Sequence, residues 1–368
     1  MQKRAEILKI NPDYPENEKI TKAADFIKKG KLVAFPTETV YGLGADGLNP
    51  EALRLLFEVK KRPQGKAVAL LISDFADLER LARDIPQEAF KVIDKLWPGP
   101  LTIILRATDL VPEIIRGKEL TVGISDTVGL RMPDNKIARA LIESAKTPIA
   151  CSSANISGEG EPTTSQEVIS NLAGKIDLII DGGKTTIGVA STVLGLTGET
   201  PTIIREGAIS SEKLLKTLNS KHILFVCTGN TCRSFMAEKL FQKMAKEAGA
   251  NLEIQSAGTS ANTQGEIPLL SLKALEKEGI IPEKFAPTPL SERLIKKADL
   301  ILVMEEYHQR RVLNILPTAM EKTFLLTEYA GLRKKDIPDP MGGSWEGYET
   351  CLIEIKRCLN EVIKRVAE

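Results

Sequence analysis

The sequence has 368 residues, a length that exceeds one ordinary domain and suits two. Apolar residues make up 42% of it and charged residues 27%, a balance typical of folded globular chains and not of disordered ones. The net charge of +1 divides into −1 over residues 1–210, with 27 basic and 28 acidic residues, and +2 over residues 211–368, with 23 and 21. Neither half is therefore a basic module that would bind nucleic acid indiscriminately.

Cysteine and histidine usage narrows the chemistry further. The five cysteines form no Cys-x-x-Cys pair and no disulfide framework, so we expect a reducing, cytoplasmic environment. The two histidines, His222 and His308, are expected to be structural or surface residues, and two are too few for a histidine-rich metal site. No segment has the apolar length of a signal peptide or a membrane helix, so no membrane contact is expected.

The first half of the chain alternates short β-branched runs with helical stretches. Residues 31–40 predict a strand that runs into a turn, and residues 51–62 predict an amphipathic helix with a basic C-terminal end. Further strands are predicted at residues 101–107, 127–133, 176–183, 191–196 and 202–207. This alternation predicts an α/β domain with a mixed, twisted sheet over residues 1–210.

A change of pattern marks the predicted domain boundary. A linker helix is expected within residues 211–220, and an almost continuous apolar strand opens at residue 222, as in a parallel strand buried on both faces. The elements expected after the boundary are strands at 222–227, 252–256, 299–304 and 322–326 and helices at 234–247, 269–279 and 344–366. Residues 221–368 therefore predict a doubly wound sheet of four parallel strands.

The loop after the first of these strands carries the most specific motif, Cys-Thr-Gly-Asn-Thr-Cys-Arg-Ser at 227–234. Its place between a strand and a helix predicts an anion cradle of main-chain N–H groups. We expect Cys227 at its base to have a lowered pKa and to act as nucleophile, with Arg233 holding two phosphoryl oxygens. Ser234 is expected to donate a hydrogen bond to the sulfur. The phosphate-loop residues are Thr228, Gly229, Asn230, Thr231, Cys232 and Ser234.

A leaving group must also receive a proton, so the reaction needs an acid from elsewhere in the chain. Asp339, in a Pro- and Gly-rich loop before the last helix, is the candidate, and Asp336 is its rival. The structural alternatives are a buried cysteine near a surface arginine and a plain turn aspartate.

Residues 221–368 closely resemble the low-molecular-weight protein phosphatase family, through the 227–234 loop, the Ser256-Ala257-Gly258 strand exit and the Asp339-Pro340 loop. The resemblance implies that Cys227 becomes a phosphocysteine, that Arg233 binds the phosphoryl group, and that Asp339 is the general acid and then the base, with no cofactor. The loop that contains Thr231 resembles that of the protein-arginine phosphatase subgroup. This resemblance implies phosphoarginine in phosphorylated proteins as the substrate. Phosphotyrosine remains the alternative, and arsenate reduction a more distant one.

Two positions depart from the phosphatase pattern. Phe235 stands where the family usually has proline, a change expected to loosen the cradle. Met341 stands where an aromatic residue is usual, which weakens one expected wall of the site.

Four clusters stand out in the first half: residues 36–44, residues 60–66, Thr127 with Arg131, and residues 152–158. Each alone is also consistent with a helix end or a loop. Together they suit nucleotide chemistry, because basic side chains can neutralise a triphosphate and hydroxyls can hold a small polar substrate. No G-x-x-x-x-G-K-[ST] loop is present, so a P-loop ATPase is excluded.

These clusters, in this order, resemble the threonylcarbamoyl-AMP synthase (YrdC-like) family over residues 15–210. The resemblance implies condensation of L-threonine, bicarbonate and ATP, with Mg²⁺ on the phosphates, for tRNA threonylcarbamoyladenosine synthesis by a downstream tRNA threonylcarbamoyl transferase machinery. It implies threonine contacts by Thr39, Arg131 and Ser191. It implies ATP contacts by Lys60, Arg62, Lys66, Thr127, Ser153 and Arg205.

Alternatives and departures remain for this half as well. A double-stranded RNA-binding module is the alternative function, which the near-neutral charge disfavours. The departures from the family pattern are Ala67 in place of proline, Cys151 in place of serine, and Glu161 near the expected nucleotide. The whole chain is thus expected to be a bifunctional enzyme.

Overall fold

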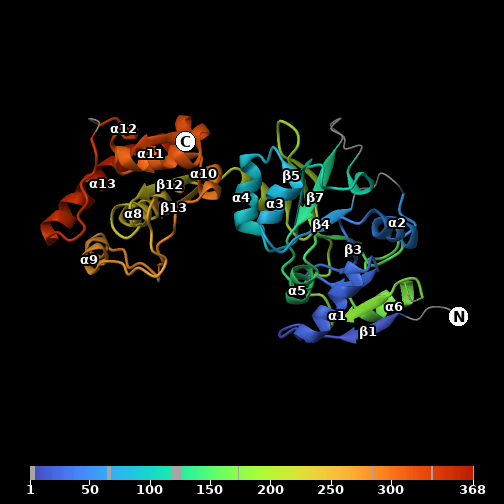
Figure 1. Ribbon diagram of the computed structural model, residues 1–368. Helices are drawn as coiled ribbons and strands as arrows, with labels where there is room; N and C mark the ends of the chain where they lie inside the picture. The colour runs from blue at the N-terminus through green and yellow to red at the C-terminus, as the bar shows by residue number, and fades with distance from the viewer. Residues whose placement is uncertain are drawn as a thin grey trace. The chain divides into compact units, whose positions relative to one another are not determined.

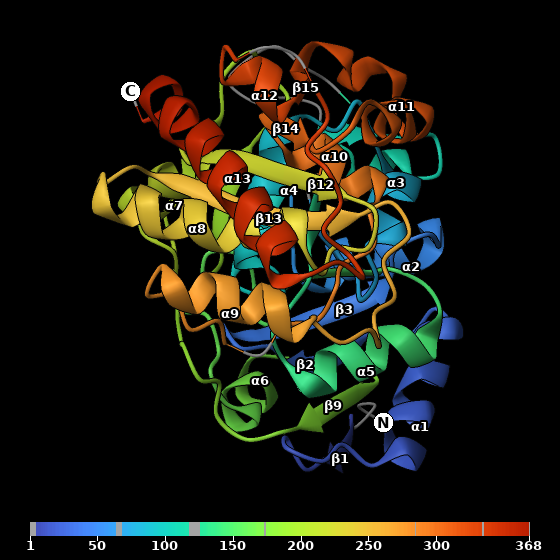
Figure 2. The same cartoon turned by 90° about the vertical axis from the view of Figure 1, so that its left-hand side faces the viewer.

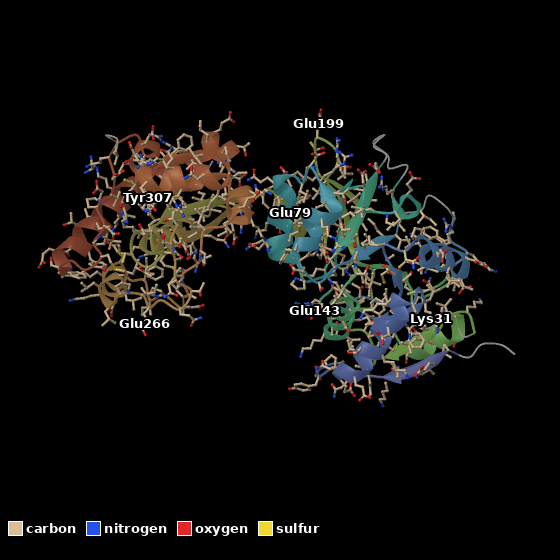
Figure 3. All side chains as sticks on the ribbon, in the orientation of Figure 1. Lys31, Glu79, Glu143, Glu199, Glu266 and Tyr307 are labelled. Atoms are coloured by element: carbon tan, nitrogen blue, oxygen red, sulfur yellow. The ribbon has the colours of Figure 1, made fainter. Side chains whose placement is uncertain are left out.

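The computed structural model describes residues 5–63, 68–117, 126–172, 174–283, 285–332 and 335–367. The chain divides into two compact units, Met1–Leu215 and Lys216–Glu368, and each is described by itself. Charged side chains such as Lys31, Glu143 and Glu266 point outward from them (Figure 3). Within the described ranges, no helix combines the length and apolar character needed to cross a membrane.

The first unit is built on one mixed sheet, as predicted. Its strands are β1 (Glu6–Lys9), β2 (Val33–Pro36), β3 (Tyr41–Asp46), β4 (Ala69–Leu71), β5 (Ala82–Arg83), β6 (Leu101–Ala107), β7 (Thr127–Arg131), β8 (Ile149–Ser153), β9 (Leu178–Asp181), β10 (Thr192–Gly195) and β11 (Thr202–Arg205). They run in the order β1-β9-β2-β3-β8-β4-β7-β6-β10-β11, and β5 pairs with β6. Parallel pairs such as β6–β10 lie beside antiparallel pairs such as β3–β8 in this sheet.

Helices cover the sheet of the first unit. They are α1 (Asn17–Lys28), α2 (Pro50–Val59), α3 (Ala76–Leu81), α4 (Gln87–Leu96), α5 (Lys136–Ala145) and α6 (Ser165–Leu172), with a 3-10 turn at Glu113–Ile115. Helix α7 (Ser211–Leu218) spans the boundary between the two units. Helices α1 and α5, which lie side by side in Figure 1, share one apolar core with β2 and β9. The apolar stripe of α2 faces inward through Leu53, Leu56 and Phe57, which are buried.

Strand β3 was not predicted, because residues 31–40 were expected to form one strand that runs into a turn. Gly42 and Gly44 lie within β3. A Cβ atom at Gly44 would lie 2.6 Å from the Phe35 ring and 2.7 Å from an Ile149 methyl group. These glycines therefore allow neighbouring strands to pack closely while the backbone stays extended.

The second unit has the predicted four-stranded parallel sheet. Its strands are β12 (Lys221–Cys227), β13 (Leu252–Gly258), β14 (Leu300–Val303) and β15 (Thr323–Leu325), in the order β13-β12-β14-β15. Its helices are α8 (Arg233–Glu247), α9 (Leu269–Lys277), α10 (Glu292–Lys297), α11 (Glu306–Ile315), α12 (Leu326–Tyr329) and α13 (Trp345–Val366), with a 3-10 turn at Pro317–Lys322.

Alternate residues of β12 enter two separate cores. Phe225 and Cys227 belong to the core that contains α8 and α13, which cross one face of the sheet (Figure 2). Leu224 and Val226 belong to the core that contains residues of α10 and α11. Burial on both faces explains why β12 is apolar almost throughout. In α/β folds, ligands bind at the carboxyl end of such a parallel strand.

Candidate active sites

A cavity of about 530 Å³ opens in the first unit among β3, β6, β7, β8 and β10. Its lining includes the predicted residues Thr39, Lys60, Arg62, Thr127, Arg131, Ser153, Ser191 and Arg205. Lys66 and Ala67 lie outside the described residues. Residues distant in the sequence thus share one concave site, large enough for a nucleotide with a small second substrate.

Arg131 is a buried cation of this cavity, with 7% of its surface exposed. Its Nη2 atom donates to Thr39 Oγ1 at 2.9 Å, and its Nε donates to the carbonyl of Gly99 at 3.3 Å. The same Nη2 lies 2.8 Å from Oε1 of Glu38, which is 5% exposed. Arg131 is therefore held in one orientation by a hydroxyl, a carbonyl and a carboxylate.

Two arginines bring positive charge to another part of the lining. Burial lowers the pKa of Arg62, and the nearby charge of Arg205 lowers it further. Arg205 donates to the carbonyl of Ser191 at 2.7 and 3.2 Å. Two like charges near one another favour an anion between them, as a polyphosphate would supply.

Lys60 is 1% exposed, and its ammonium donates to the carbonyls of Ser153 and Asn155, the latter at 2.8 Å. It therefore ties the end of α2 to the loop after β8 as well as lining the cavity. Ser191 Oγ lies 2.9 Å from Thr102 Oγ1, and this contact orients two hydroxyl groups of the cavity lining.

Three residues that the sequence analysis did not assign also belong to this site. Ser152 Oγ and Asn155 Oδ1 line the cavity, are buried, and have no hydrogen-bond partner among the described residues. Glu38 adds the carboxylate that holds Arg131. The sequence analysis singled out the run of residues 152–155 but assigned a ligand contact only to Ser153.

Two departures noted in the sequence fall in the same cavity. Cys151 lines it, and burial raises the pKa of its thiol to about 12, so the group stays protonated at neutral pH. Glu161 lines it as well and adds a negative charge.

In the second unit, the loop after β12 curls around the sulfur of Cys227. The main-chain N–H of Asn230 donates to Sγ at 3.3 Å, and Ser234 Oγ lies 3.0 Å from Sγ. Asn230 has a left-handed backbone with φ of 57°, which turns its N–H inward. Cys227 is 3% exposed, yet its sulfur faces these donors.

Arg233 begins α8 and is 1% exposed. Its Nη2 donates to Asp339 Oδ2 at 2.6 Å, and its Nη1 donates to the Ile337 carbonyl at 3.0 Å and to Glu305. Burial opposes its charge, but the Glu305 hydrogen bond and the negative charge of Asp339 outweigh burial and raise the guanidinium pKa. The structure thus brings together Cys227, Arg233 and Asp339.

The sequence predicted a lowered pKa for the Cys227 thiol, whereas its pKa is raised in the structure. Burial raises the pKa of the thiol, while hydrogen bonds from Ser234 and Asn230 and the charge of Arg233 lower it in part. The physical reason is that burial of the sulfur disfavours the charged thiolate more than these groups stabilise it.

The two candidate acids have different surroundings. Asp336 Oδ1 accepts the main-chain N–H of Glu306 at 2.9 Å, at the start of α11. Asp339 instead faces Arg233 and also accepts the main-chain N–H of Met341 at 3.1 Å. This geometry favours Asp339 as the acid at the cradle.

His308 is a contact of the loop that the sequence analysis did not assign to the site. It is fully buried, and its Nε2 lies 2.9 Å from Thr228 Oγ1. Burial and then the charge of Arg233 lower its pKa to about 4, so the ring is neutral near pH 7. Its neighbour Tyr307 is 44% exposed on α11 (Figure 3).

Phe235 does not leave a gap where proline is usual. Its ring is fully buried and lies 4.6 Å from that of Phe285, centroid to centroid. The ammonium of Lys239 lies 5.0 Å from the Phe285 ring centroid. Aromatic packing therefore supports the first turn of α8.

The remaining cysteines lie in or near the core. Cys351 and Cys358 of α13 are buried, and burial raises their pKa values to about 12 and 11. Cys232 Sγ lies 3.5 Å from the Tyr348 hydroxyl. Within the described ranges, no three His, Cys, Asp or Glu side chains are arranged to hold a metal ion.

Comparison with known proteins gives a match for each unit. Residues 25–207 match the Sua5/YciO/YrdC family model, described as telomere recombination. Residues 222–368 match the low molecular weight phosphotyrosine protein phosphatase model.

Individual relatives match the first unit, and one solved structure covers more of the chain. A threonylcarbamoyl-AMP synthase of Pyrococcus abyssi is 47% identical over 208 residues, which are 56% of this chain and 59% of the relative. A putative threonylcarbamoyl-AMP synthase of Methanocaldococcus jannaschii is 36% identical over 57% of this chain and 97% of its own. The solved structure of P. abyssi Sua5 complexed with L-threonine is 32% identical, covers 87% of this chain and 99% of its own, and has a TM-score of 0.54. The chain thus spans about three fifths of the length of the first of these relatives.

Proposed function

Because the chain belongs to the Sua5/YciO/YrdC family over residues 25–207 and to the low-molecular-weight phosphatase family over residues 222–368, we propose that it carries two enzyme activities. The first is ATP-dependent synthesis of threonylcarbamoyl-AMP. The second is cysteine-dependent dephosphorylation of phosphoproteins, with phosphoarginine as the preferred group.

The first activity joins L-threonine, bicarbonate and ATP into threonylcarbamoyl-AMP, pyrophosphate and water. The main support for this activity is the 530 Å³ cavity. Its lining combines the buried Arg131 with two neighbouring arginines, Arg62 and Arg205. Arg131, oriented by Thr39 and Glu38, suits the carboxylate of threonine. Ser191 is the third residue proposed for threonine.

The ATP phosphates are assigned to the arginine pair, Arg62 and Arg205, whose mutual repulsion an anion would relieve. Lys60, Lys66, Thr127 and Ser153 complete the proposed ATP contacts. Mg²⁺ would arrive with the phosphates and neutralise part of their charge. Catalysis rests on positioning and charge neutralisation, without a covalent enzyme intermediate.

Pyrophosphate release from ATP by the full chain tests this activity. We expect release to require both L-threonine and bicarbonate, and to fall to background without either. L-Serine, which lacks one methyl group, serves as the matched control substrate. Release that is unchanged without threonine would refute the proposed substrate. Binding of double-stranded RNA without any pyrophosphate release would favour the alternative function. The product is proposed to pass to a tRNA threonylcarbamoyl transferase machinery.

The phosphatase activity begins with attack of the Cys227 thiolate on phosphorus. The bond from phosphorus to the leaving nitrogen or oxygen breaks as Asp339 donates a proton to that atom, which leaves a phosphocysteine. Water, deprotonated by Asp339, then attacks phosphorus, and the thiolate and inorganic phosphate are released. The main support for this activity is that Ser234 Oγ and the Asn230 N–H contact the sulfur of Cys227, on which the charge of Arg233 also acts.

Phosphoarginine is favoured by the polarity of the surroundings. Thr231 presents a small polar side chain, where an aliphatic one would suit a phenyl ring. The carboxylate of Asp339, which already pairs with the Arg233 guanidinium, could also pair with a leaving group that departs as a guanidinium cation. Arsenate reduction is disfavoured, because Cys351 and Cys358 are buried in the core.

Turnover of a phosphoarginine peptide against a phosphotyrosine peptide tests this preference, with Cys227→Ser as the blank. We expect phosphoarginine to have the higher kcat/KM, and Thr231→Ile to shift the ratio toward phosphotyrosine. An unchanged ratio in Thr231→Ile would refute the role given to Thr231.

A further inference from the structure

Glu38 is a buried carboxylate that pairs with Arg131, the residue proposed above for the carboxylate of threonine. Its Oε1 atom lies 2.8 Å from Arg131 Nη2, and both side chains are more than nine-tenths buried. Neither oxygen of Glu38 has a hydrogen-bond partner among the described residues. Its negative charge is therefore directed to one cation, and the two opposite charges cancel within the buried pair.

The main chain fixes the position of Glu38 independently of its side chain. The N–H of Ile187 donates to the Glu38 carbonyl at 2.8 Å, and the N–H of Gly188 donates to the Thr39 carbonyl at 2.9 Å. The Thr186 hydroxyl also donates to the Glu38 carbonyl, at 3.2 Å. A neutral side chain of the same shape at position 38 should therefore leave this turn in place.

Glu38 acts on the cavity from outside its lining. Thr37 and Thr39 on either side of it line the cavity, as does Arg131, whereas Glu38 is not among the described lining residues. Arg131 uses Nε and Nη2 for its hydrogen bonds to described residues, so Nη1 remains for a ligand carboxylate. The ammonium of an amino acid is attached to the carbon beside that carboxylate. A ligand that meets Nη1 thus brings its ammonium into the electric field of the whole pair.

The remaining charges of the cavity make this pairing important. The other charged residues of the described lining are Lys60, Arg62, Arg205, Glu159 and Glu161. The three cations among them are already assigned to ATP. An unbalanced charge on Arg131 would therefore attract a second anion to the threonine end and repel an ammonium. With Glu38 beside it, Arg131 keeps a donor for the ligand without this excess charge.

We propose that Glu38 is a positioning residue that gives the threonine site its preference for zwitterions. By balancing the charge of Arg131, it makes this end of the cavity favour a carboxylate with a neighbouring ammonium over a plain carboxylate anion. The proposal rests on the synthase function and on the threonine contact of Arg131 proposed above. Glu38 touches no substrate, and its effect passes through Arg131 and the local electric field.

Binding of three related ligands to the full chain tests this proposal, measured by titration calorimetry without ATP. The ligands are L-threonine, its hydroxy-acid analogue 2,3-dihydroxybutanoate, which has no ammonium, and L-threoninol, which has no carboxylate. In the parent, L-threonine should have the lowest Kd of the three. In Glu38→Gln, we expect the Kd of L-threonine to rise and that of dihydroxybutanoate to fall, so that their ratio changes by about 10- to 100-fold.

Two further variants separate charge from structure. Glu38→Asp keeps the charge and should keep most of the preference for L-threonine. Glu143→Gln removes an exposed carboxylate of the same unit, labelled in Figure 3, and should leave all three Kd values at the parent level. A parent-like Kd ratio in folded Glu38→Gln would overturn the proposal, and so would a parent that does not bind L-threonine. Equal losses in Glu38→Asp and Glu38→Gln would contradict a role of charge.

Arg131→Gln keeps the test decisive if Glu38→Gln does not fold. It leaves the carboxylate of Glu38 unbalanced, so the cationic L-threoninol should bind about 10-fold more tightly than it binds the parent. Loss of a carboxylate contact alone would not cause this gain, so an unchanged Kd for L-threoninol would refute the charge balance. Threonine-dependent pyrophosphate release by the parent is measured in parallel. Its absence would count against the synthase function, whereas the Kd ratio tests the charge balance without turnover.

Discussion

The Nη2 atom of Arg233 lies 2.6 Å from Oδ2 of Asp339, across 106 residues of sequence. The cation proposed to hold the phosphoryl group thus also orients the carboxyl group proposed to give the leaving group its proton. Asp336, only three residues earlier, is directed instead to the start of α11.

This difference predicts separate outcomes for the two aspartates. Asp339→Asn should lower kcat by about 10²–10⁴-fold, because general acid catalysis is lost. The loss should grow as the leaving group becomes more basic, which a series of aryl phosphates would measure. Asp336→Asn is the control and should keep kcat within a few-fold of the parent. Equal losses in both variants would contradict the assignment of Asp339.

Arg131→Lys should weaken threonine use selectively. Lysine cannot reproduce contacts of one guanidinium with Thr39, Glu38 and Gly99 together. We expect the KM for L-threonine to rise about 10- to 100-fold, as for loss of a charged hydrogen bond, with little change in the KM for ATP. Pyrophosphate release at varied concentrations of each substrate measures both, and the exposed Arg106 supplies the control Arg106→Lys. An equal rise in both KM values would argue against a threonine site at Arg131.

The lowered pKa of His308 predicts that the stability of the second unit depends on pH. Its pKa is lowered to about 4 from an ordinary 6.5, so the folded state binds fewer protons than the unfolded state between these values. Its contribution is complete above pH 6.5 and is lost as the pH falls toward 4, by at most about 3 kcal/mol. Hydrogen exchange of the amides of α8 and β12, measured at pH 7 and 4.5, reports this loss.

The variant His308→Gln supplies the comparison for that measurement. Glutamine can still hydrogen-bond Thr228 but does not titrate, so the exchange of its second unit should depend less on pH than in the parent. The amides of β6 in the first unit should respond to pH alike in both proteins. Identical pH dependence of α8 in parent and variant would contradict the prediction.

Phe235→Ala should destabilise the second unit by about 3–5 kcal/mol, the usual loss for a buried phenylalanine. The ring is fully buried against Phe285, at the turn that carries Arg233 and Ser234. We therefore also expect the inhibition constant for inorganic phosphate to rise. Phe285→Ala, at a partly exposed position, should cost less. Unchanged hydrogen exchange of α8 in Phe235→Ala would show that the packing does not support the cradle.

Much of the fold was predictable because it is encoded locally. The apolar run of β12 and the alternation of strands and helices after residue 221 indicated the four-stranded parallel sheet. Strand β3 was missed, because the close approach of Phe35 and Ile149 that requires Gly44 arises between strands and leaves no local pattern.

The sequence by itself determined the alternation of strands and helices after residue 221 and the residue types of both candidate sites, because spacing and apolar periodicity are properties of neighbouring residues. The two families were indicated by the resemblance of its motifs. Tertiary structure alone decided that Asp339 rather than Asp336 faces Arg233, and that Glu38 pairs with Arg131. It also reversed the expected direction of the Cys227 pKa. The physical reason is that burial, ion pairing and hydrogen-bond direction depend on distant segments that meet only when the chain folds.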